Sequence, residues 1–188
     1  IKKKKLNYFL KTNRIDNVDK YLSKFTFSKN GKFPLSKKQL QSLPINFKKR
    51  LAIANKRMNN LGSITEIKPQ NCKYCDFLTY SFPCQDLSNA SMGKAMGMEK
   101  GSGTRSSLLW EIERLLNIYQ QKKKPKILFL ENVPSLLSKK FYQEYKKWTK
   151  TLEKFGYFTI TIGDSNSEIL SAIDFGIPQK RKRIYAVS

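Results

Sequence analysis

The sequence contains no histidine and only three cysteines, which leaves few side chains that could bind zinc. Cys72 and Cys75 form an isolated C-x-x-C pair, but a zinc site needs two further ligands. A redox-active pair is expected after a strand and at the start of a helix, whereas this pair precedes an apolar stretch typical of a strand. We therefore expect two incidental thiols and no metal. Three cysteines cannot form a disulfide framework, which favours a reducing, cytoplasmic setting.

Long apolar runs are also missing. No stretch approaches the roughly 18 apolar residues that a membrane-spanning helix needs, so we expect no membrane partner. The first residues, IKKKKLNYFLKTN, are basic but lack the apolar core and cleavage site of a signal peptide. Because the sequence does not begin with methionine, we expect it to be part of a longer chain.

Acidic residues are scarce. Asp and Glu number 14 against 37 Lys and Arg, which gives a net charge of +23 in 188 residues. Such an excess usually indicates a polyanionic partner, either nucleic acid or an anionic membrane surface. An AT-rich coding sequence would also enrich lysine, so the charge alone does not identify the partner.

The pattern of apolar residues divides the chain into two parts. Residues 1–60 are rich in lysine, and helical stretches within 38–60 are interrupted by Pro44, which predicts a basic, partly helical insertion or N-terminal extension. Residues 61–188 alternate short apolar runs with helical periodicity, which predicts an α/β domain with a largely parallel sheet. The expected strands are 62–69 (short, with a turn), 76–82, 127–131, 157–162 and 183–188, and the expected helices are 108–119 and 141–156.

Two reactive side chains follow two of these strands. In TYSFPCQDLS, residues 79–88, Cys84 comes directly after an expected strand, and Glu131 ends the next one, ILFLE. A right-handed crossover often places two such strands side by side, and ligands bind beyond their carboxyl ends. We therefore expect Cys84 and Glu131 to project into one cleft.

A thiol beside a carboxylic acid in a basic protein suits an attack on cytosine. A thiolate adds to C6 while an acid protonates or hydrogen-bonds N3, and C5 then becomes nucleophilic enough to take a methyl group. A cationic neighbour such as Arg183 would favour the thiolate. Taken singly, a cysteine at a strand end is most often a packing residue, and a glutamate there is most often solvated.

Three motifs occur in the order and spacing found in C5-cytosine DNA methyltransferases. SFPCQDLS resembles their P-C-Q nucleophile motif, LENV at 130–133 their E-N-V motif, and QKRKR at 179–183 their Q-x-R-x-R motif. TRSSLLWEIERLL at 104–116 is similar to the helix between the first two motifs, and GSITEI at 62–67 to the segment beside the cofactor adenine. The resemblance covers about residues 60–188. TYSFPCQDLS and GSGTRSSLLWEIER are close to the corresponding segments of bacterial enzymes that methylate CpG, and residues 20–60 resemble the basic insertion of that group.

The resemblance implies a Rossmann-like class I S-adenosylmethionine-dependent methyltransferase sheet, with S-adenosyl-L-methionine as cofactor and double-stranded DNA as partner. The target cytosine would be flipped out of the duplex, and such enzymes often belong to restriction-modification systems. The implied catalytic residues are Cys84 as nucleophile, Glu131 at N3 and Arg183 at O2. The implied substrate-binding residues are Gln85, Ser88, Arg105, Asn132 and Arg181, and the implied cofactor contacts are Ile64 and Leu108.

The sequence also departs from the family. It has no F-x-G-x-G loop for the cofactor and no recognition domain after Q-x-R-x-R, and Ser63 stands where the family usually has an acid. We therefore expect an incomplete sheet, 61–188 being a partial catalytic domain whose missing parts a separate chain could carry. Two alternatives remain open: an RNA cytosine-5 methyltransferase, and a non-catalytic nucleic-acid-binding remnant or split-enzyme part.

Overall fold

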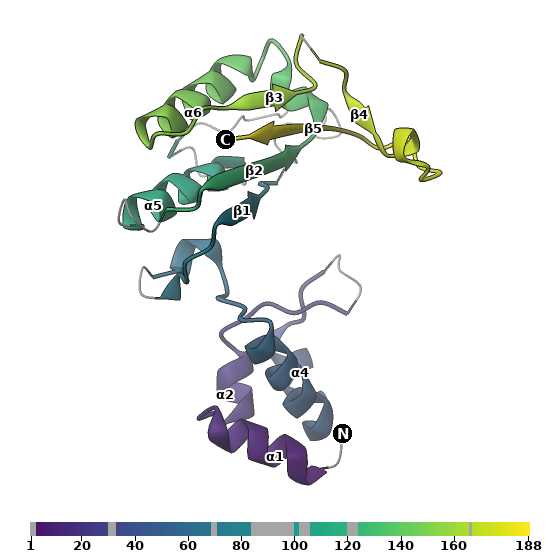
Figure 1. Cartoon of the computed structure of the whole chain (residues 1–188). Helices are drawn as coiled ribbons and strands as arrows, with labels where there is room; N and C mark the ends of the chain where they lie inside the picture. Colours follow the sequence, from purple (N-terminus) through teal and green to yellow (C-terminus); the bar gives the residue numbers. More distant parts are fainter. Residues whose placement is uncertain are drawn as a thin grey trace. The chain divides into compact units, whose positions relative to one another are not determined.

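The computed structural model describes residues 3–29, 33–68, 71–83, 100–101, 106–119, 124–165 and 167–188. The chain forms two compact units, Ile1–Asn71 and Cys72–Ser188 (Figure 1). Each unit has its own core and is described by itself. The domain limits expected from the sequence were 1–60 for a basic insertion or N-terminal extension and 61–188 for a partial catalytic domain. They remain a prediction.

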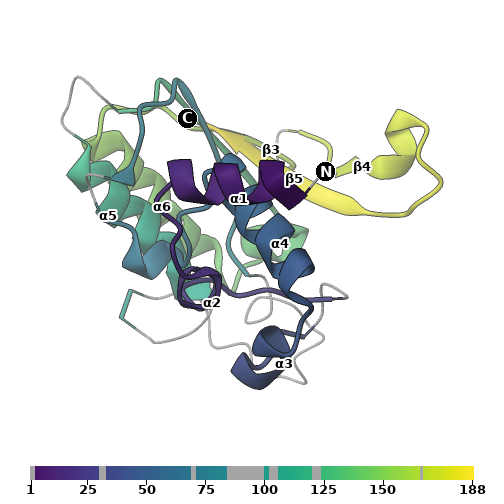
Figure 2. The same ribbon diagram turned by 90° about the horizontal axis from the view of Figure 1, so that it is seen from below.

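The N-terminal unit is helical. Its helices are α1 (Lys3–Thr12), α2 (Val18–Leu22), α3 (Lys37–Gln41) and α4 (Ile45–Arg57), and α1 and α2 both pack against α4 (Figure 2). The expected break at Pro44 is confirmed, because Pro44 immediately precedes α4. Lysine-rich as it is, the unit buries an apolar core made of Leu6, Leu10, Ile15, Val18, Leu22, Leu40, Ala52 and Ile53.

Local hydrogen bonds begin the short helices of this unit. The Asn17 side chain accepts from the backbone N–H of Lys20 at 2.8 Å and caps α2. Ser36 and Gln39 form a reciprocal capping box at the start of α3. The strand expected at 62–69 is wrong, because a 3₁₀ turn, η1 (Ile64–Glu66), lies there instead. The segment has only two large apolar residues, Ile64 and Ile67, and the described residues of this unit contain no strand to pair with it, so the local turn prevails.

The C-terminal unit contains the sheet. Its strands are β1 (Phe77–Tyr80), β2 (Ile127–Asn132), β3 (Ile160–Ile162), β4 (Leu170–Ser171) and β5 (Lys182–Val187). They are ordered β1-β2-β5-β3, with β4 paired to β5. The α/β class and the four strands expected within this unit are confirmed, although each differs by a few residues at its ends.

The expectation of a largely parallel sheet is only partly right. β1 and β2 pair in parallel, whereas β5 runs antiparallel to both β2 and β3 and lies between them. The 3₁₀ turn η7 (Ala172–Phe175) and the segment after it bring the chain back in the opposite direction before β5 begins. Apolar periodicity identifies a strand but carries no information about its direction, which is why the sequence did not reveal this reversal.

Two helices pack against one face of the sheet (Figure 1). They are α5 (Trp110–Ile118), entered through the 3₁₀ turn η4 (Ser106–Leu109), and α6 (Tyr142–Lys154), which follows η6 (Pro134–Leu137). Trp148 of α6 is buried, meets Trp110 edge-on at 5.7 Å between ring centroids, and donates its indole N–H to the Tyr80 hydroxyl at 3.0 Å. Burial raises the pKa of Tyr80, so the phenol remains protonated in this contact. The strand residues beneath the helices are Tyr80, Leu128, Leu130, Ile184 and Ala186.

Along the described residues, no helix is long and apolar enough to cross a membrane.

Gly163, which follows β3, provides a test of this packing. Its φ is +99°, and a Cβ added there would lie 2.9 Å from Cγ2 of the buried Ile184. We expect Gly163→Ala to lower the free energy of unfolding by about 2–4 kcal/mol, because backbone strain adds to overpacking. Urea unfolding of the chain measures the loss.

Gly176→Ala is the matched control. Gly176 also has a positive φ, +77°, but no atom lies within 4 Å of an added Cβ. It should therefore cost only the backbone strain of about 1–2 kcal/mol. Equal losses in the two variants would contradict the close approach of Gly163 to Ile184.

Candidate active site

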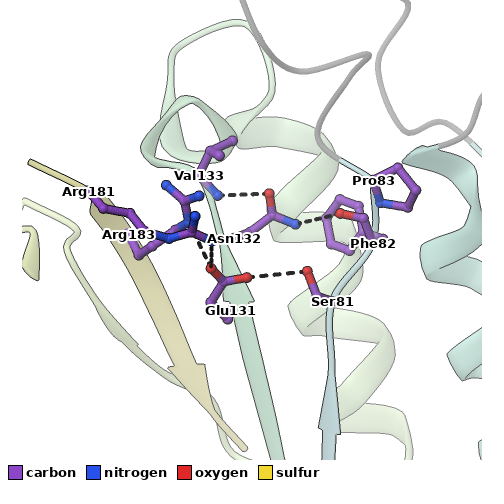
Figure 3. Close-up of a pocket in the computed structure, with 8 residues that line it drawn as sticks. All are labelled: Ser81, Phe82, Pro83, Glu131, Asn132, Val133, Arg181 and Arg183. Atoms are coloured by element: carbon purple, nitrogen blue, oxygen red, sulfur yellow. Dashed lines mark hydrogen bonds and ion pairs between the residues drawn. The ribbon is translucent and has the colours of Figure 1, made fainter. Parts of the chain in front are cut away.

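A cavity of about 340 Å³ lies at the edge of the sheet where β1 and β2 end. Because these two strands are parallel neighbours, their carboxyl ends meet at one edge, and the antiparallel β5 begins at the same edge. Three segments distant in sequence therefore surround one space (Figure 3). The residues that line it are Ser81, Phe82, Pro83, Glu131, Asn132, Val133, Arg181 and Arg183.

Glu131 is at the centre of the polar contacts in this cavity (Figure 3). Alternation along β2 points Leu130 and Asn132 into the core and leaves the Glu131 side chain one-third exposed. Its Oε1 accepts from Arg183 Nε at 2.7 Å, and Arg181 Nη2 lies 3.8 Å from the same oxygen. Among the described residues, its Oε2 accepts a single, long hydrogen bond, 3.4 Å, from the Ser81 hydroxyl. The two carboxylate oxygens are thus unequally engaged.

Arg183 is held at two points. Besides the bond from Nε to Glu131, Nη1 donates to the backbone carbonyl of Lys182 at 2.7 Å. Its side chain is 21% exposed, against 52% for Arg181, so Arg183 is the more fixed of the two guanidinium groups. The planar fork of an arginine keeps its remaining donors in a defined direction when two are engaged.

Asn132 joins the ends of the two parallel strands. Its side chain is buried, its Nδ2 donates to the Phe82 carbonyl at 3.2 Å, and its Oδ1 accepts from the Val133 backbone N–H at 2.8 Å. Both ends of the amide are therefore satisfied inside the protein, as a buried polar group requires. The bond to Phe82 fixes the backbone that leaves β1.

Ser106 fixes the same segment from the other side. This serine is fully buried, and its hydroxyl donates to the Pro83 carbonyl at 2.6 Å. The carbonyls of Phe82 and Pro83 thus each accept from a side chain, one on β2 and one at the start of η4. Pro83 is the residue immediately before Cys84 in the sequence.

The structure brings together four of the site residues predicted from the sequence, namely Glu131, Asn132, Arg181 and Arg183. Four others, Cys84, Gln85, Ser88 and Arg105, lie outside the described residues. Sequence reasoning missed Ser81 and Ser106 as polar contacts of the site. Both stand inside segments quoted for other reasons, next to the P-C-Q motif and in the helix that follows, and a serine in the sequence does not indicate which acceptor its hydroxyl reaches, here the Glu131 carboxylate for Ser81 and the Pro83 carbonyl for Ser106.

The two expected cofactor contacts do not meet within either unit. Ile64 is a half-buried residue of η1 in the N-terminal unit, and Leu108 is a half-buried residue of η4 in the C-terminal unit. Each offers the aliphatic surface that an adenine ring or a methionine chain would need. Leu108 is not among the described residues that line the cavity, and both cofactor contacts stay predictions. The described residues include no cluster of three or more residues suited to a metal ion.

The cavity has the chemistry of a site for one planar polar ring. Its volume is at the lower end of the range of small-molecule pockets, and its polar groups are one carboxylate, two guanidinium groups and a hydroxyl. A carboxylate with adjacent guanidinium donors can hydrogen-bond a ring nitrogen and a neighbouring carbonyl oxygen at the same time.

Comparison with known proteins shows to which family the chain belongs. A family model described as C-5 cytosine-specific DNA methylase matches residues 25–188. The chain is 40% identical over 173 residues to the orphan methyltransferase M.SssI of Spiroplasma monobiae, which covers 89% of this chain and 42% of that protein. It is 44% identical over 140 residues to the type II methyltransferase M2.ScrFI of Lactococcus lactis subsp. cremoris, covering 74% of this chain and 36% of that protein.

Among solved structures, the Entamoeba histolytica methyltransferase EhMeth matches with a TM-score of 0.47 and 28% sequence identity, covering 72% of this chain and 40% of that one. The chain therefore spans about two-fifths of the length of these relatives. The family match extends over most of the chain and includes every segment that surrounds the cavity. The chain belongs to the C-5 cytosine-specific DNA methylase family.

Proposed function

We propose that this chain supplies the base pocket and the nucleophile of a DNA (cytosine-5-)-methyltransferase. The observation that supports the proposal best is the convergence of Glu131, Asn132 and Arg183 with the segment that leads to Cys84. Family membership supports it independently. Because the chain spans only part of its relatives, the proposed activity is that of a longer protein or of an assembly with a second chain.

The first step is addition of the Cys84 thiolate to C6 of cytosine. Glu131 first takes up a proton from solvent at Oε2. A bond then forms between sulfur and C6, the electrons of the C5–C6 double bond move through C4 to N3, and N3 takes the proton from the Glu131 carboxyl group. Arg183 donates to O2 and stabilises the charge that develops there. The ring is left with a nucleophilic C5.

The second step completes the transfer at C5. S-adenosylmethionine, when bound, supplies the electrophilic methyl group that C5 takes up. A base then removes the proton from C5, the sulfur–C6 bond breaks, and Cys84 leaves as a thiolate. The N3 proton returns to Glu131, so both residues regain their starting states. Ile64 and Leu108 are the residues we assign to the adenine and methionine parts of the cofactor.

The unequal contacts of the carboxylate indicate which oxygen serves N3. Oε1 is held by Arg183 at 2.7 Å, whereas the part of the chain that the structure describes gives Oε2 only the 3.4 Å contact from Ser81. A hydrogen bond of 3.4 Å is weak and easily exchanged. We therefore assign Oε2 to cytosine N3, with Oε1 keeping Arg183 in position for O2.

The target base must leave the duplex to reach this pocket, since its C5 and C6 are otherwise covered by neighbouring bases. Gln85 and Ser88 would belong to the loop that closes over the flipped nucleotide, Arg105 would contact a phosphate, and Arg181 would support the base pocket or a phosphate. The likeness of TYSFPCQDLS to enzymes that methylate CpG supports CpG as the target. The name type II methyltransferase, carried by M2.ScrFI, supports a role in restriction and modification.

Replacing Cys84 tests the nucleophile. In M.SssI with this chain in place of the matching 173-residue segment, Cys84→Ser should lower the rate of DNA methylation at least about a thousandfold, because a serine hydroxyl is scarcely ionised at neutral pH. Incubation with a duplex containing 5-fluorocytosine and S-adenosylmethionine should give a covalent protein–DNA adduct only when Cys84 is present. Methylation at an undiminished rate by Cys84→Ser would disprove this role.

Replacing Glu131 tests the acid. Glu131→Gln keeps the size of the side chain and an oxygen for Arg183 but cannot give a proton to N3. In the same chimera we expect kcat to fall by about a hundredfold or more, with little change in the KM for DNA. Glu111→Gln is the matched control, because Glu111 also pairs with an arginine, Arg114 at 2.6 Å, but lies on α5 away from the cavity. A similar loss in both variants would count against an acid role for Glu131.

Replacing Asn132 tests whether its side chain stabilises the ends of β1 and β2. Asn132→Ala leaves the Phe82 carbonyl and the Val133 N–H without their side-chain partner, which should lower the free energy of unfolding by about 1–3 kcal/mol. Asn132→Asp is the comparison, since it keeps the acceptor for Val133 but faces the Phe82 carbonyl with a second oxygen. Thermal or urea unfolding of the chain gives the free energy of unfolding of both variants. An unchanged stability of Asn132→Ala would show that the two hydrogen bonds of this side chain contribute nothing.

A further inference from the structure

The positive charge of the chain is concentrated in the N-terminal unit. Residues 1–71 contain 18 Lys and Arg and three acidic residues, whereas residues 72–188 contain 19 Lys and Arg and 11 acidic residues. The unit that lacks the candidate active site thus carries most of the net charge. A solvated surface needs far less charge than this to stay soluble.

This unit has a groove of about 710 Å³ along α1 and the C-terminal part of α4. Its floor is apolar, because Leu6 and Ile53 are buried members of the unit's core. Its rim is cationic and aromatic. The residues that line it are Lys4, Lys5, Leu6, Tyr8, Phe9, Ile53 and Arg57.

Contacts within the unit hold this groove in shape. The Arg57 guanidinium lies over the Phe9 ring, 5.2 Å from its centroid, so the cation is positioned by an aromatic face. Lys49 on α4 donates to the Asn7 side chain on α1 at 2.8 Å and ties the two helices together. Tyr8 is 73% exposed and leaves its ring open to a ligand.

The groove cations have no carboxylate partner among the described residues. The unit's three acidic residues are Asp16, Asp19 and Glu66, and none of them lines the groove. The ion pair observed in the unit joins Asp19 to Lys48 at 2.7 Å. Lys4, Lys5 and Arg57 are therefore neutralised by solution ions, which a polyanion can release on binding.

We propose that the groove between α1 and α4 binds the sugar–phosphate backbone of double-stranded DNA, outside the nucleotide that enters the active site. Lys4, Lys5 and Arg57 contact phosphates, and Tyr8 lies against the adjoining sugar. DNA as the partner rests on the proposed function, but the contact itself needs no cytosine and no catalytic residue. Arginine and lysine side chains held along a groove can contact phosphates at defined spacing. Such phosphate contacts carry no information about the DNA sequence.

A pair of double variants of the 188-residue chain tests the proposal. Lys4→Ala/Lys5→Ala removes two charges from the groove, and Lys37→Ala/Lys38→Ala removes two exposed charges from α3 of the same unit. All four side chains are exposed, and alanine favours helix, so both variants should keep the unfolding temperature of the unchanged chain. The ligand is a duplex containing only A·T pairs, so no target cytosine is present.

Binding is measured as a function of salt concentration. Each lost phosphate contact lowers the slope of log Kobs against log salt by about 0.9, so the groove variant should lower it by about 2. The α3 variant should lower it by less than half as much, although its net charge is the same. Arg57→Lys keeps the charge but loses the planar fork above Phe9, and should weaken binding by about three- to tenfold with a nearly unchanged slope.

Three outcomes would overturn the proposal. They are equal slopes for the two double variants, an undiminished affinity of the groove variant, and a groove-dependent preference for duplex RNA or for anionic lipid vesicles over duplex DNA. The catalytic proposal fails on a different measurement, the absence of an adduct with 5-fluorocytosine DNA, so the two can be judged separately.

Discussion

Leu78 and Tyr80 on β1 pair in parallel register with Leu128 and Leu130 on β2, and this pairing makes both strands end at the same edge of the sheet. The position of every other part of the site follows from that edge. Asn132 reaches the Phe82 carbonyl because the two strands end level with one another. β5, running the opposite way, begins there, so its first residues face the end of β2. A shift of one residue in the register would move Glu131 to the helix-covered face.

The contacts around Glu131 matter more for the chemistry of the site than for the stability of the fold. A partly exposed ion pair contributes little to the free energy of folding, because desolvation of both groups offsets most of the attraction. The stability of the C-terminal unit comes instead from the buried side chains between sheet and helices, with Trp148 among the largest. One carboxylate beside two guanidinium groups leaves an excess of positive charge in the cavity. That excess suits a ring that gains electron density during the reaction.

The sequence predicted the strands of the C-terminal unit because short apolar runs bounded by charged or turn residues form a strong local signal. It predicted that Glu131, Asn132, Arg181 and Arg183 would share a site through motif resemblance, since nothing local distinguishes the QKRKR segment from a solvated basic loop. The direction of β5 and the contacts of Ser81 with Glu131 and of Ser106 with Pro83 depend on tertiary pairing, so no periodic pattern in the sequence predicts them. The core of the N-terminal unit was missed for a related reason. Its apolar residues are divided among helices α1, α2, α3 and α4 and the turns between them, so this core forms only when the helices pack together.

For the proposed function, each of the two units would supply a different property that a base-flipping enzyme needs. Removing a cytosine from the stack costs a few kcal/mol, and a small cavity with a handful of polar groups gains little until the base is already inside. Contacts to phosphates form before the base moves and are available on any duplex, so they can hold the protein on DNA while the base opens. On the proposed function, the strongly basic helical unit provides this prior contact, and the sheet unit, with its smaller net charge, provides discrimination and chemistry.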